Sequence, residues 1–438
     1  MIERRARDGV MRRAFSASNS SLGGGYVLTL NSLVGAALGF AFWIVAAQRF
    51  APADIGFASA TVAGAALISG IGTDGLHNTF LRFVPRAGDG WPAIVVRGYT
   101  VASVTTALLA SLFILAASRL DSALGRLGTA SWILLFVAVG PIWGVFSLQD
   151  VVLIARRHAR LVLIENTAVS LARIVLLFTG LLGDGAQGIF VAWLLPAIVA
   201  VFVITPYLAC SARTTAGEWP SLRARAVGRD MFRYYAGATV GSIAMILQIS
   251  AMPVIVAAAS GVSTNARFYL PWAIGTSLQL VSSSMAAPLA AEIARGITDE
   301  RQQVKRVLGH CTSATAAVAV PLYFLVPPVL GRLGDSYRVE KPLFALLLVA
   351  ALANAIPSVY LARARARGDV TGAALAQWAA AIVLLAGSAV LLPTVGLVGV
   401  GLAAVAAQSA AAAIAFARDA SDEAEGGETV ARTGEGTI

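Results

Sequence analysis

Stretches of about 20 apolar residues recur along the whole chain, and they are the feature that most constrains its fold. A run of that length can span the hydrocarbon core of a bilayer as a single helix. With 58% hydrophobic and only 13% charged residues, the chain cannot cover itself with polar surface. This composition excludes a soluble enzyme, a nucleic-acid-binding domain and a disordered scaffold. The stretches lie near 26–47, 55–76, 93–117, 130–154, 161–182, 187–210, 232–258, 267–290, 308–330, 343–362, 371–391 and 396–417.

We therefore predict an all-α polytopic membrane protein with about 12 transmembrane helices. The basic residues support that number. If the N-terminus is cytoplasmic, 25 of the 33 Lys and Arg residues fall in cytoplasmic segments, seven fall outside, and Arg173 falls within a span. Positively charged segments stay on the cytoplasmic side of a membrane, so we predict that both termini are cytoplasmic. The net charge of +10 then reflects orientation in the membrane and gives no reason to expect nucleic acid as a partner.

The spans divide into two groups of six. We predict a cytoplasmic basic tail over 1–25, an N-lobe of helices 1–6 over 26–210, a cytoplasmic linker over 211–230, a C-lobe of helices 7–12 over 231–418 and a disordered acidic tail over 419–438. Because six is an even number, the two lobes enter the membrane in the same orientation and form parallel repeats. Such repeats are typical of transporters that bind their substrate between the halves.

A weak internal repeat follows the same division. The second span opens with Asp54-Ile55-Gly56-Phe57-Ala58, and the eighth opens with Asn265-Ala266-Arg267-Phe268-Tyr269. The first and seventh spans each carry a GxxxG pattern, Gly35/Gly39 and Gly237/Gly241. This pattern is a packing signal in membrane helices, although its pairing here is as well explained by chance in a chain with 42 glycines.

The sequence offers no catalytic or cofactor chemistry. It has no phosphate-binding loop and no nucleophile–base pattern, and its predicted outer loops are too short for a catalytic domain. The histidines, His77, His158 and His310, are spaced unlike metal ligands. We predict that the chain is not an enzyme and that it holds no metal or cofactor, while a coupling proton or Na⁺ stays open.

Charged residues inside the predicted spans carry the functional information, because each costs at least a few kcal/mol there. Arg173 lies about 18 Å into the fifth span, near the bilayer midplane. A guanidinium facing a central cavity would bind an anionic head group such as a pyrophosphate through its planar set of donors. The alternative is a buried ion pair with Asp150 or Glu165.

Further polar positions complete the candidate site. Asp150 joins Arg173 as a substrate-binding candidate from the first lobe, and Gln248 and Gln279 join from the second, which has no charge deep in a span. A cavity that is cationic on one side and neutral on the other suits an anionic, sugar-bearing substrate. The candidates for an inner gate are Asp74, Asn78, Arg82 and Glu165. Alternatively, these residues are only polar side chains at helix ends that lie in water or at the membrane interface.

Several segments resemble the Wzx-like polysaccharide flippases of the multidrug/oligosaccharidyl-lipid/polysaccharide (MOP) exporter superfamily. The resemblance covers most of residues 26–418 and includes Asp54-Ile55-Gly56-Phe57-Ala58-Ser59-Ala60, Leu81-Arg82-Phe83-Val84-Pro85-Arg86 and Gly334-Asp335-Ser336-Tyr337. The segments Phe42–Phe50, Ser147–Leu153 and Phe268–Glu292 contribute in the same order along the chain. Arg173 falls where such proteins carry Lys or Arg.

This resemblance implies a MATE/MOP-like fold in the bacterial plasma (inner) membrane. It implies alternating access, with a lipid-linked oligosaccharide such as an undecaprenyl-pyrophosphate glycan moved to the outer leaflet for cell-surface polysaccharide biosynthesis. The partners implied are that lipid-linked oligosaccharide and membrane lipid, together with a polysaccharide polymerase and glycosyltransferases. Two alternatives stay open: a cation-coupled small-molecule or drug antiporter of the same superfamily, and a membrane-embedded glycan-biosynthesis enzyme.

Overall fold

A computed structural model describes most of the chain as helix. The described residues are 27, 28, 30–119, 123–156, 158–180, 183, 185–213, 221–294, 299–334 and 337–434. The predicted basic tail over 1–25 and the Asp335-Ser336 pair lie outside them. Among the described residues, regular structure is helical throughout, so the predicted all-α class is confirmed.

The helices follow the predicted spans closely. The first described helix is Leu30–Arg49, and eleven helices in the described part of the chain are long and apolar enough to cross a membrane. The later helices are α2 (Pro52–Phe83), α3 (Trp91–Arg119), α4 (Ala130–Ala155), α5 (Ala159–Thr179), α6 (Ala186–Arg213), α7 (Ser221–Ser260), α8 (Val262–Ala294), α9 (Glu300–Gly331), α10 (Lys341–Ala353), α11 (Ala355–Arg367), α12 (Val370–Val395) and α13 (Leu397–Gly434).

Three boundaries differ from the predicted ones. Helix α7 begins at Ser221, so the second half of the predicted linker is helical. Helix α13 continues to Gly434, so the disorder predicted over 419–438 is wrong for 419–434. Ala and Glu residues are good helix formers, and an existing helix propagates through them without a new nucleation step. The tenth predicted span consists of two helices, α10 and α11, which meet at Asn354.

Helix α8 is the span whose sequence is least apolar, and it is absent from the eleven candidates found in the described residues. It carries Asn265, Arg267 and Gln279, followed by the run Ser282-Ser283-Ser284. It contacts α9, α10 and α11, and its first turns also contact the start of α2. Helix α8 is therefore held by protein contacts on several sides.

The described helices group into two compact units. The first unit comprises residues up to Ala51, then Ile68–Arg119 and Arg126–Ala238. The second comprises Pro52–Leu67, Leu120–Gly125 and the residues from Thr239 onward. Helix α2 is thus divided between the units after Leu67, and helix α7 is divided after Ala238. The division into lobes at 211–230 stays a prediction.

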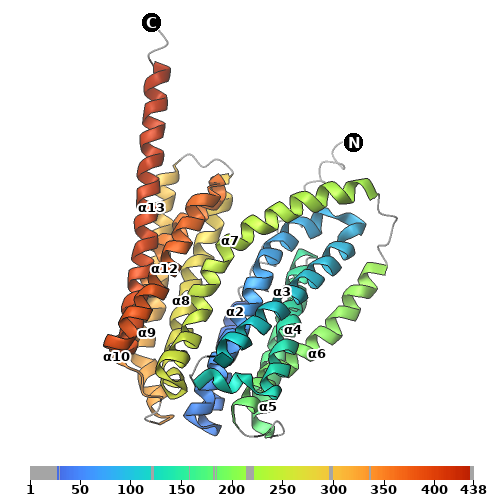
Figure 1. The fold of residues 1–438 in the computed structure, drawn as a ribbon. Coiled ribbons are helices and arrows are strands. Elements are labelled where there is room, and N and C mark those ends of the chain that lie inside the picture. Colours follow the sequence, from blue (N-terminus) through green and yellow to red (C-terminus); the bar gives the residue numbers. More distant parts are fainter. Residues whose placement is uncertain are drawn as a thin grey trace, which may run out of the picture. The chain divides into compact units, whose positions relative to one another are not determined.

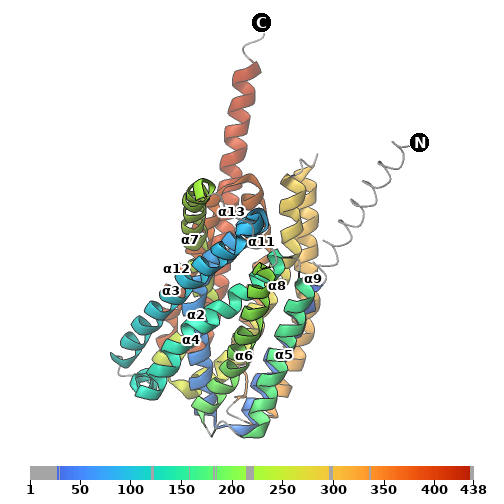
Figure 2. The same ribbon diagram turned by 90° about the vertical axis from the view of Figure 1, so that its right-hand side faces the viewer.

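The first unit is built from α3, α4, α5 and α6 with the second half of α2. Helix α4 contacts α3, α5 and α6, and α5 lies beside α6 (Figure 2). A series of aromatic rings runs through this unit, and successive ring centroids are 4.3 to 6.0 Å apart. Its members, in order, are Phe113, Phe136, Phe190, Trp193 and Trp143. Such offset pairs stabilise a core beyond their buried area.

The core of the second unit is rich in alanine. Helix α13 packs along α12 and α10 (Figure 1), and Ala380, Ala403, Ala407 and Ala411 are almost fully buried there. Small side chains let membrane helices approach closely, because lipid supplies no hydrophobic force between them. Two larger side chains of α8, Phe268 and Trp272, stack on each other and belong to the same core.

A second close approach joins the starts of α2 and α8, the two segments of the predicted repeat. Asn265 Nδ2 donates to the Gly56 carbonyl at 2.8 Å and to Ser59 Oγ at 3.0 Å. A Cβ on Gly56 would overlap the main-chain oxygen of Val262, so this crossing requires glycine. By contrast, the glycines of the two GxxxG patterns meet no atom within 4 Å of an added Cβ, and they do not mediate packing.

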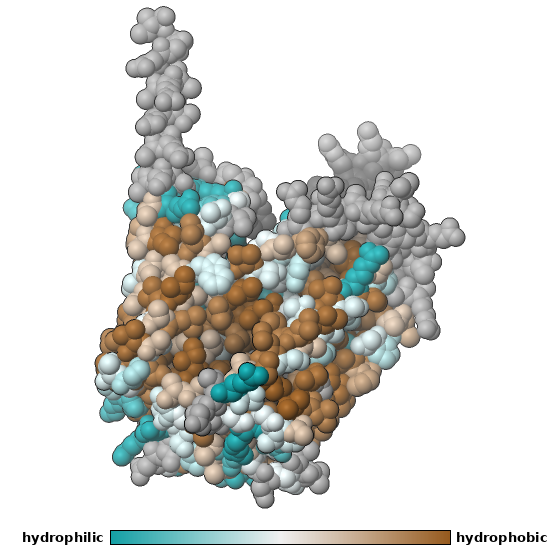
Figure 3. Space-filling view, viewed as in Figure 1, coloured by the Kyte–Doolittle hydropathy of each residue, from teal (hydrophilic) through white to brown (hydrophobic). Residues whose placement is uncertain are grey.

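Large apolar side chains cover the outside of both units. Leu108, Leu134 and Phe202 in the first unit are 67%, 72% and 73% exposed, and Phe324 and Val390 in the second are 68% and 67% exposed. In the space-filling view, apolar residues dominate the middle of the visible surface, while most polar residues lie near helix ends (Figure 3). A surface of this kind needs lipid around it, as the sequence predicted.

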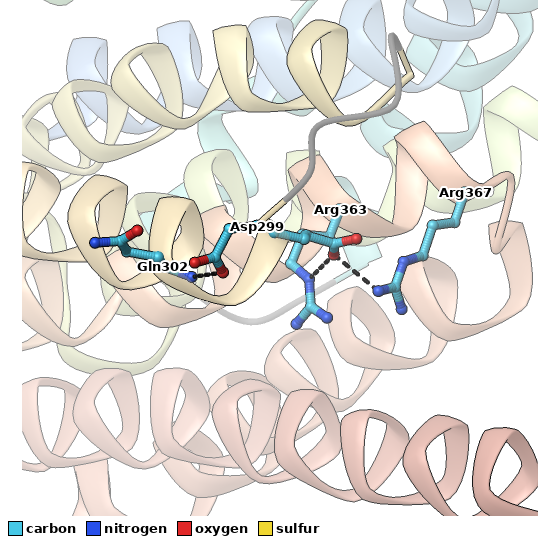
Figure 4. Close-up of polar contacts among 5 residues, drawn as sticks. Asp299, Gln302, Arg363 and Arg367 are labelled. Carbon is cyan, nitrogen blue, oxygen red and sulfur yellow. Dashed lines mark hydrogen bonds and ion pairs between the residues drawn. The ribbon is translucent and has the colours of Figure 1, made fainter.

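Helices α9 and α11 are fastened together at one end of the second unit. Glu300 Oε1 accepts hydrogen bonds from Arg363 Nε at 2.9 Å and from Arg367 Nη2 at 2.8 Å (Figure 4). Beside it, Asp299 caps the start of α9 by accepting from the Gln302 amide at 3.0 Å. Glu300, Arg363 and Arg367 all lie near helix ends that the charge distribution predicts to be cytoplasmic.

Candidate functional site

Arg173 lies on the face of α5 that packs inside the first unit. The buried residues of this helix, Val162, Glu165, Val169 and Leu177, lie on the same side as Arg173. The exposed apolar residues Ile164, Leu171, Val175 and Phe178 lie on the opposite side, where the helix meets lipid. The guanidinium is therefore directed into the protein.

Two tryptophans enclose the Arg173 guanidinium. Its Cζ lies 5.0 Å from the ring centroid of Trp193 on α6 and 5.4 Å from that of Trp143 on α4. Its Nε donates to the Trp193 carbonyl at 2.8 Å. The predicted alternative, an ion pair with Asp150 or Glu165, is not formed. Its Nη2 is buried and has no hydrogen-bond partner. A cation above two indole faces is stabilised by their quadrupoles, and no carboxylate in the described part of the chain forms an ion pair with this one.

Asp150 and Glu165 belong to a second cluster, nearer the turn between α4 and α5. Asn166 Nδ2 donates to Asp150 Oδ2 at 2.9 Å, while Asp150 Oδ1 has no partner. Glu165 is only 7% exposed, and neither of its carboxylate oxygens has a partner. The structure thus brings the substrate candidate Asp150 together with the gate candidate Glu165, and it separates both from Arg173.

The remaining gate candidates lie at the end of α2. The Asn78 amide donates back to the Asp74 carbonyl at 3.1 Å, which is a contact within one helix turn. Arg82 is exposed, and its Cζ lies 4.6 Å from the ring centroid of Tyr234 on α7. These three residues share one helix end, as predicted, but Glu165 is not among them. Their role as a gate stays a prediction.

The two glutamines of the second unit belong to separate networks. Gln248 Nε2 on α7 donates to the Gln377 carbonyl at 3.1 Å and contacts Gln377 Oε1 at 3.4 Å. The Gln279 carbonyl on α8 accepts from Asn354 Nδ2 at 3.2 Å. Asn354 also donates to Ser358 Oγ at 3.0 Å, which ties the break between α10 and α11 to α8. The Gln248 side chain thus joins α7 to α12, whereas Gln279 contributes only its main-chain carbonyl, and contact of either side chain with substrate stays a prediction.

Sequence reasoning missed the partners of both clusters. Neither Trp143 nor Trp193 was predicted to contact Arg173, whereas here both rings lie against its guanidinium. Asn166 was overlooked although it directly follows Glu165 in the sequence. Nothing in the sequence marks Tyr99, whose buried hydroxyl on α3 interacts electrostatically with both carboxylates.

The fold is shared with solved transporters. One is a multidrug resistance MATE family transporter of the MOP superfamily in an inward-facing conformation, with a TM-score of 0.64 and 18% identity over 87% of this chain and 92% of that chain. Another is the lipid II flippase MurJ, inward closed, with a TM-score of 0.60 and 12% identity over 89% of this chain and 86% of that chain. A third is a MOP superfamily transporter from Pyrococcus furiosus, described by the reverse polarity of its binding pocket, with a TM-score of 0.58 and 15% identity over 90% and 94% of the two chains.

These similarities define the class of protein by its fold. The chain is a polytopic all-α membrane protein with a MATE/MOP-like fold, which confirms the predicted fold class. The three similar structures are described as two transporters and a flippase. Neither a family model nor a curated protein matches the chain. The Wzx-like subfamily therefore stays a prediction.

Proposed function

We propose that this protein is a transporter that flips a lipid-linked oligosaccharide, an undecaprenyl-pyrophosphate glycan, across the bacterial plasma membrane by alternating access. The observation that carries the proposal is the buried Arg173 guanidinium, which has no carboxylate partner among the described residues. Such a charge in the middle of a membrane helix costs at least a few kcal/mol and is retained in proteins for function. An anionic head group is the ligand that would offset this cost.

The surroundings of Arg173 support this class of cargo. A guanidinium presents donors in a planar arrangement that matches the oxygens of a phosphate. The faces of Trp143 and Trp193 offer apolar surfaces on which a sugar ring can stack. Because Nη2 is covered in this structure, the cargo reaches it only after the indoles move. We infer that the site is closed in this conformation and opens during the transport cycle.

The other predicted site residues are assigned secondary roles in this proposal. Gln248 and Gln279 would donate to sugar hydroxyls from the second unit. Asp74, Asn78 and Arg82 would form the inner gate. Asp150 and Glu165 are carboxylates and would repel a pyrophosphate, so we assign them no contact with the cargo.

The proposal can be tested with purified protein in proteoliposomes that contain undecaprenyl-pyrophosphate-linked oligosaccharide. A membrane-impermeant glycosidase then measures how much glycan reaches the outer leaflet. We expect Arg173→Ala to abolish this transfer, and Arg173→Lys to retain part of it. Transfer at the wild-type rate by Arg173→Ala would reject the role of this residue.

A matched control comes from the same helix. Arg49 also donates to a main-chain carbonyl of α5, that of Phe178, at 2.9 Å, and its Cζ lies 5.5 Å from the Phe178 ring centroid. It is exposed at the end of its helix and so is not a buried charge. Arg49→Ala should therefore keep wild-type transfer, which would show that losing an arginine–aromatic contact is not sufficient to stop transport.

The second candidate function is a cation-coupled small-molecule or drug antiporter with the same fold. The paired carboxylates Asp150 and Glu165 favour it, because a cationic drug needs acidic partners. Drug-resistance profiles of a strain lacking the gene separate the two functions. Increased sensitivity to cationic drugs with unchanged surface polysaccharide would favour the antiporter, and the reverse would favour the flippase.

A further inference from the structure

Helix α6 contains two prolines in its interior, Pro196 and Pro206. A proline has no amide hydrogen, so the carbonyl four residues before it loses its helical hydrogen bond and the turn between them is loosened. In a membrane span no water replaces that bond, and side chains of neighbouring helices can hold the loosened main chain instead. Each of the two proline turns of α6 has a side-chain donor of this kind.

Arg173 on α5 is the donor at the first of these turns. Its Nε donates to the carbonyl of Trp193, three residues before Pro196, at 2.8 Å. Its Cζ also lies 5.0 Å from the centroid of the Trp193 ring. The guanidinium thus holds the main chain and the side chain of one residue in the turn that Pro196 loosens.

Gln149 on α4 is the donor at the second turn. Its Nε2 donates to Thr205 Oγ1 at 2.7 Å and to the Val201 carbonyl at 3.3 Å, and Thr205 directly precedes Pro206. Gln149 is fully buried and uncharged, so an anion has no electrostatic reason to displace it. The two turns are therefore held by different chemistry, since only the Pro196 turn depends on a charged group.

The contact at the first turn cannot persist when a head group binds Arg173. Nη2 is covered in this structure, and the Trp193 ring is one of the two that lie against the guanidinium. An anion that reaches Nη2 must displace that ring. A phosphate group also offers the planar guanidinium two parallel hydrogen bonds, whereas the Trp193 carbonyl offers one acceptor. Binding therefore moves Trp193, which lies one turn before Pro196.

We propose that Pro196 is a hinge in α6 and that an anionic head group opens it by drawing Arg173 away from the Trp193 carbonyl. This hinge rests on the proposed function and adds to it the element that moves when the cargo binds. Helix α6 is followed along the chain by α7, which passes from the first unit to the second after Ala238. A bend at Pro196 therefore redirects 196–213, the segment from which the chain continues toward the second unit.

The test is hydrogen–deuterium exchange of the detergent-solubilised full chain, with inorganic pyrophosphate as the probe and peptide mass spectrometry as the readout. In the wild type we expect pyrophosphate to make the amides of 193–200 exchange about fivefold faster and to leave those of 202–210 unchanged. A ligand that only covered the site would slow exchange, so the sign of the effect is diagnostic. Arg173→Met, which removes the donor, should exchange fast at 193–200 without pyrophosphate and respond no further to it.

The matched variants are Pro196→Ala and Pro206→Ala, each of which restores an amide donor at one turn. Pro206→Ala should keep the response to pyrophosphate at 193–200, and Pro196→Ala should lose it. A response that persists in Pro196→Ala would overturn the hinge. Size-exclusion profiles identify any variant that fails to fold.

Binding of radiolabelled pyrophosphate to the same samples separates this hinge from the proposed function. Pyrophosphate that binds the wild type but leaves exchange at 193–200 unchanged or slower would overturn the hinge and leave the head-group site at Arg173 intact. An absence of binding to the wild type would overturn both.

Discussion

The two units differ in the charge of the polar groups that lie within their spans. In the first unit, the ionisable side chains Arg173, Asp150, Glu165 and Tyr99 all keep a buried polar atom without a partner. In the second, the unpartnered buried atoms within the described helices, Asn265 Oδ1 and Ser388 Oγ, are uncharged, and several neutral side chains pair across helices. The pairs are Gln248 with Gln377, Ser282 with Thr315 at 2.9 Å, and Ser283 with Ser358 at 3.2 Å.

This difference separates polar groups that hold helices together from buried ionisable groups that the described residues leave without a partner. A hydrogen bond between membrane helices contributes modestly to stability, and its partners are satisfied without further help. An unpartnered buried charge destabilises the fold, and real proteins accept such costs mainly at functional sites. We infer that the charged binding group lies in the first unit and that the polar pairs of the second hold helices together in this conformation.

Packing at glycine gives the largest expected effect. In the second unit, a Cβ on Gly56 would overlap the Val262 main chain, which cannot move aside as a flexible side chain would. In the first unit, a Cβ on Gly35 meets no atom within 4 Å. We expect Gly56→Ala to lower the free energy of unfolding by about 3 kcal/mol. Gly35→Ala should change it little. Unfolding of the detergent-solubilised variants measures both, and equal effects would contradict the difference in packing.

Replacing one buried polar side chain in each unit should change stability in opposite directions. Asn354→Leu removes the donor that joins α10 and α11 to α8, and we expect a loss of about 1 to 2 kcal/mol. Glu165→Leu removes an unpartnered carboxylate, and we expect a gain of about 1 kcal/mol. Thermal unfolding of the two variants beside the wild type is the measurement. A loss of stability in Glu165→Leu would show that the carboxylate has a structural partner and would break the comparison.

The smallest expected effect is at the fastened ends of α9 and α11. Glu300→Ala removes both hydrogen bonds to Arg363 and Arg367, but the group lies at a partly exposed helix end. We expect a loss of about 0.5 kcal/mol that shrinks as the salt concentration rises. Glu300→Gln, which keeps an acceptor oxygen, should lose less. A salt-independent loss of several kcal/mol would show that this ion-paired cluster is as important as the apolar core.

The sequence predicted the helices well because long apolar runs leave a chain few alternatives in a bilayer. The break at Asn354 went unnoticed, since a polar residue within an apolar run gives no signal of helix interruption. The depth of Arg173 within the span followed from its position in the apolar run, whereas its orientation on α5 could not be derived from that position. Its enclosure by Trp143 and Trp193 depends on α4 and α6, and contacts between helices far apart in sequence cannot be derived from one sequence.

The division of α2 has a consequence for how the chain can be cut. A fragment that ends after α6 would contain Pro52–Leu67 but not α8. It would therefore lack the Asn265 side chain that donates a hydrogen bond to the Gly56 main-chain carbonyl. The side chains of Ile55, Phe57 and Ala58 are at most 2% exposed in the full chain, and in the fragment they would lose the residues that cover them. We therefore expect that neither half of this protein folds on its own. Split versions should be recovered only when both pieces are made in the same cell.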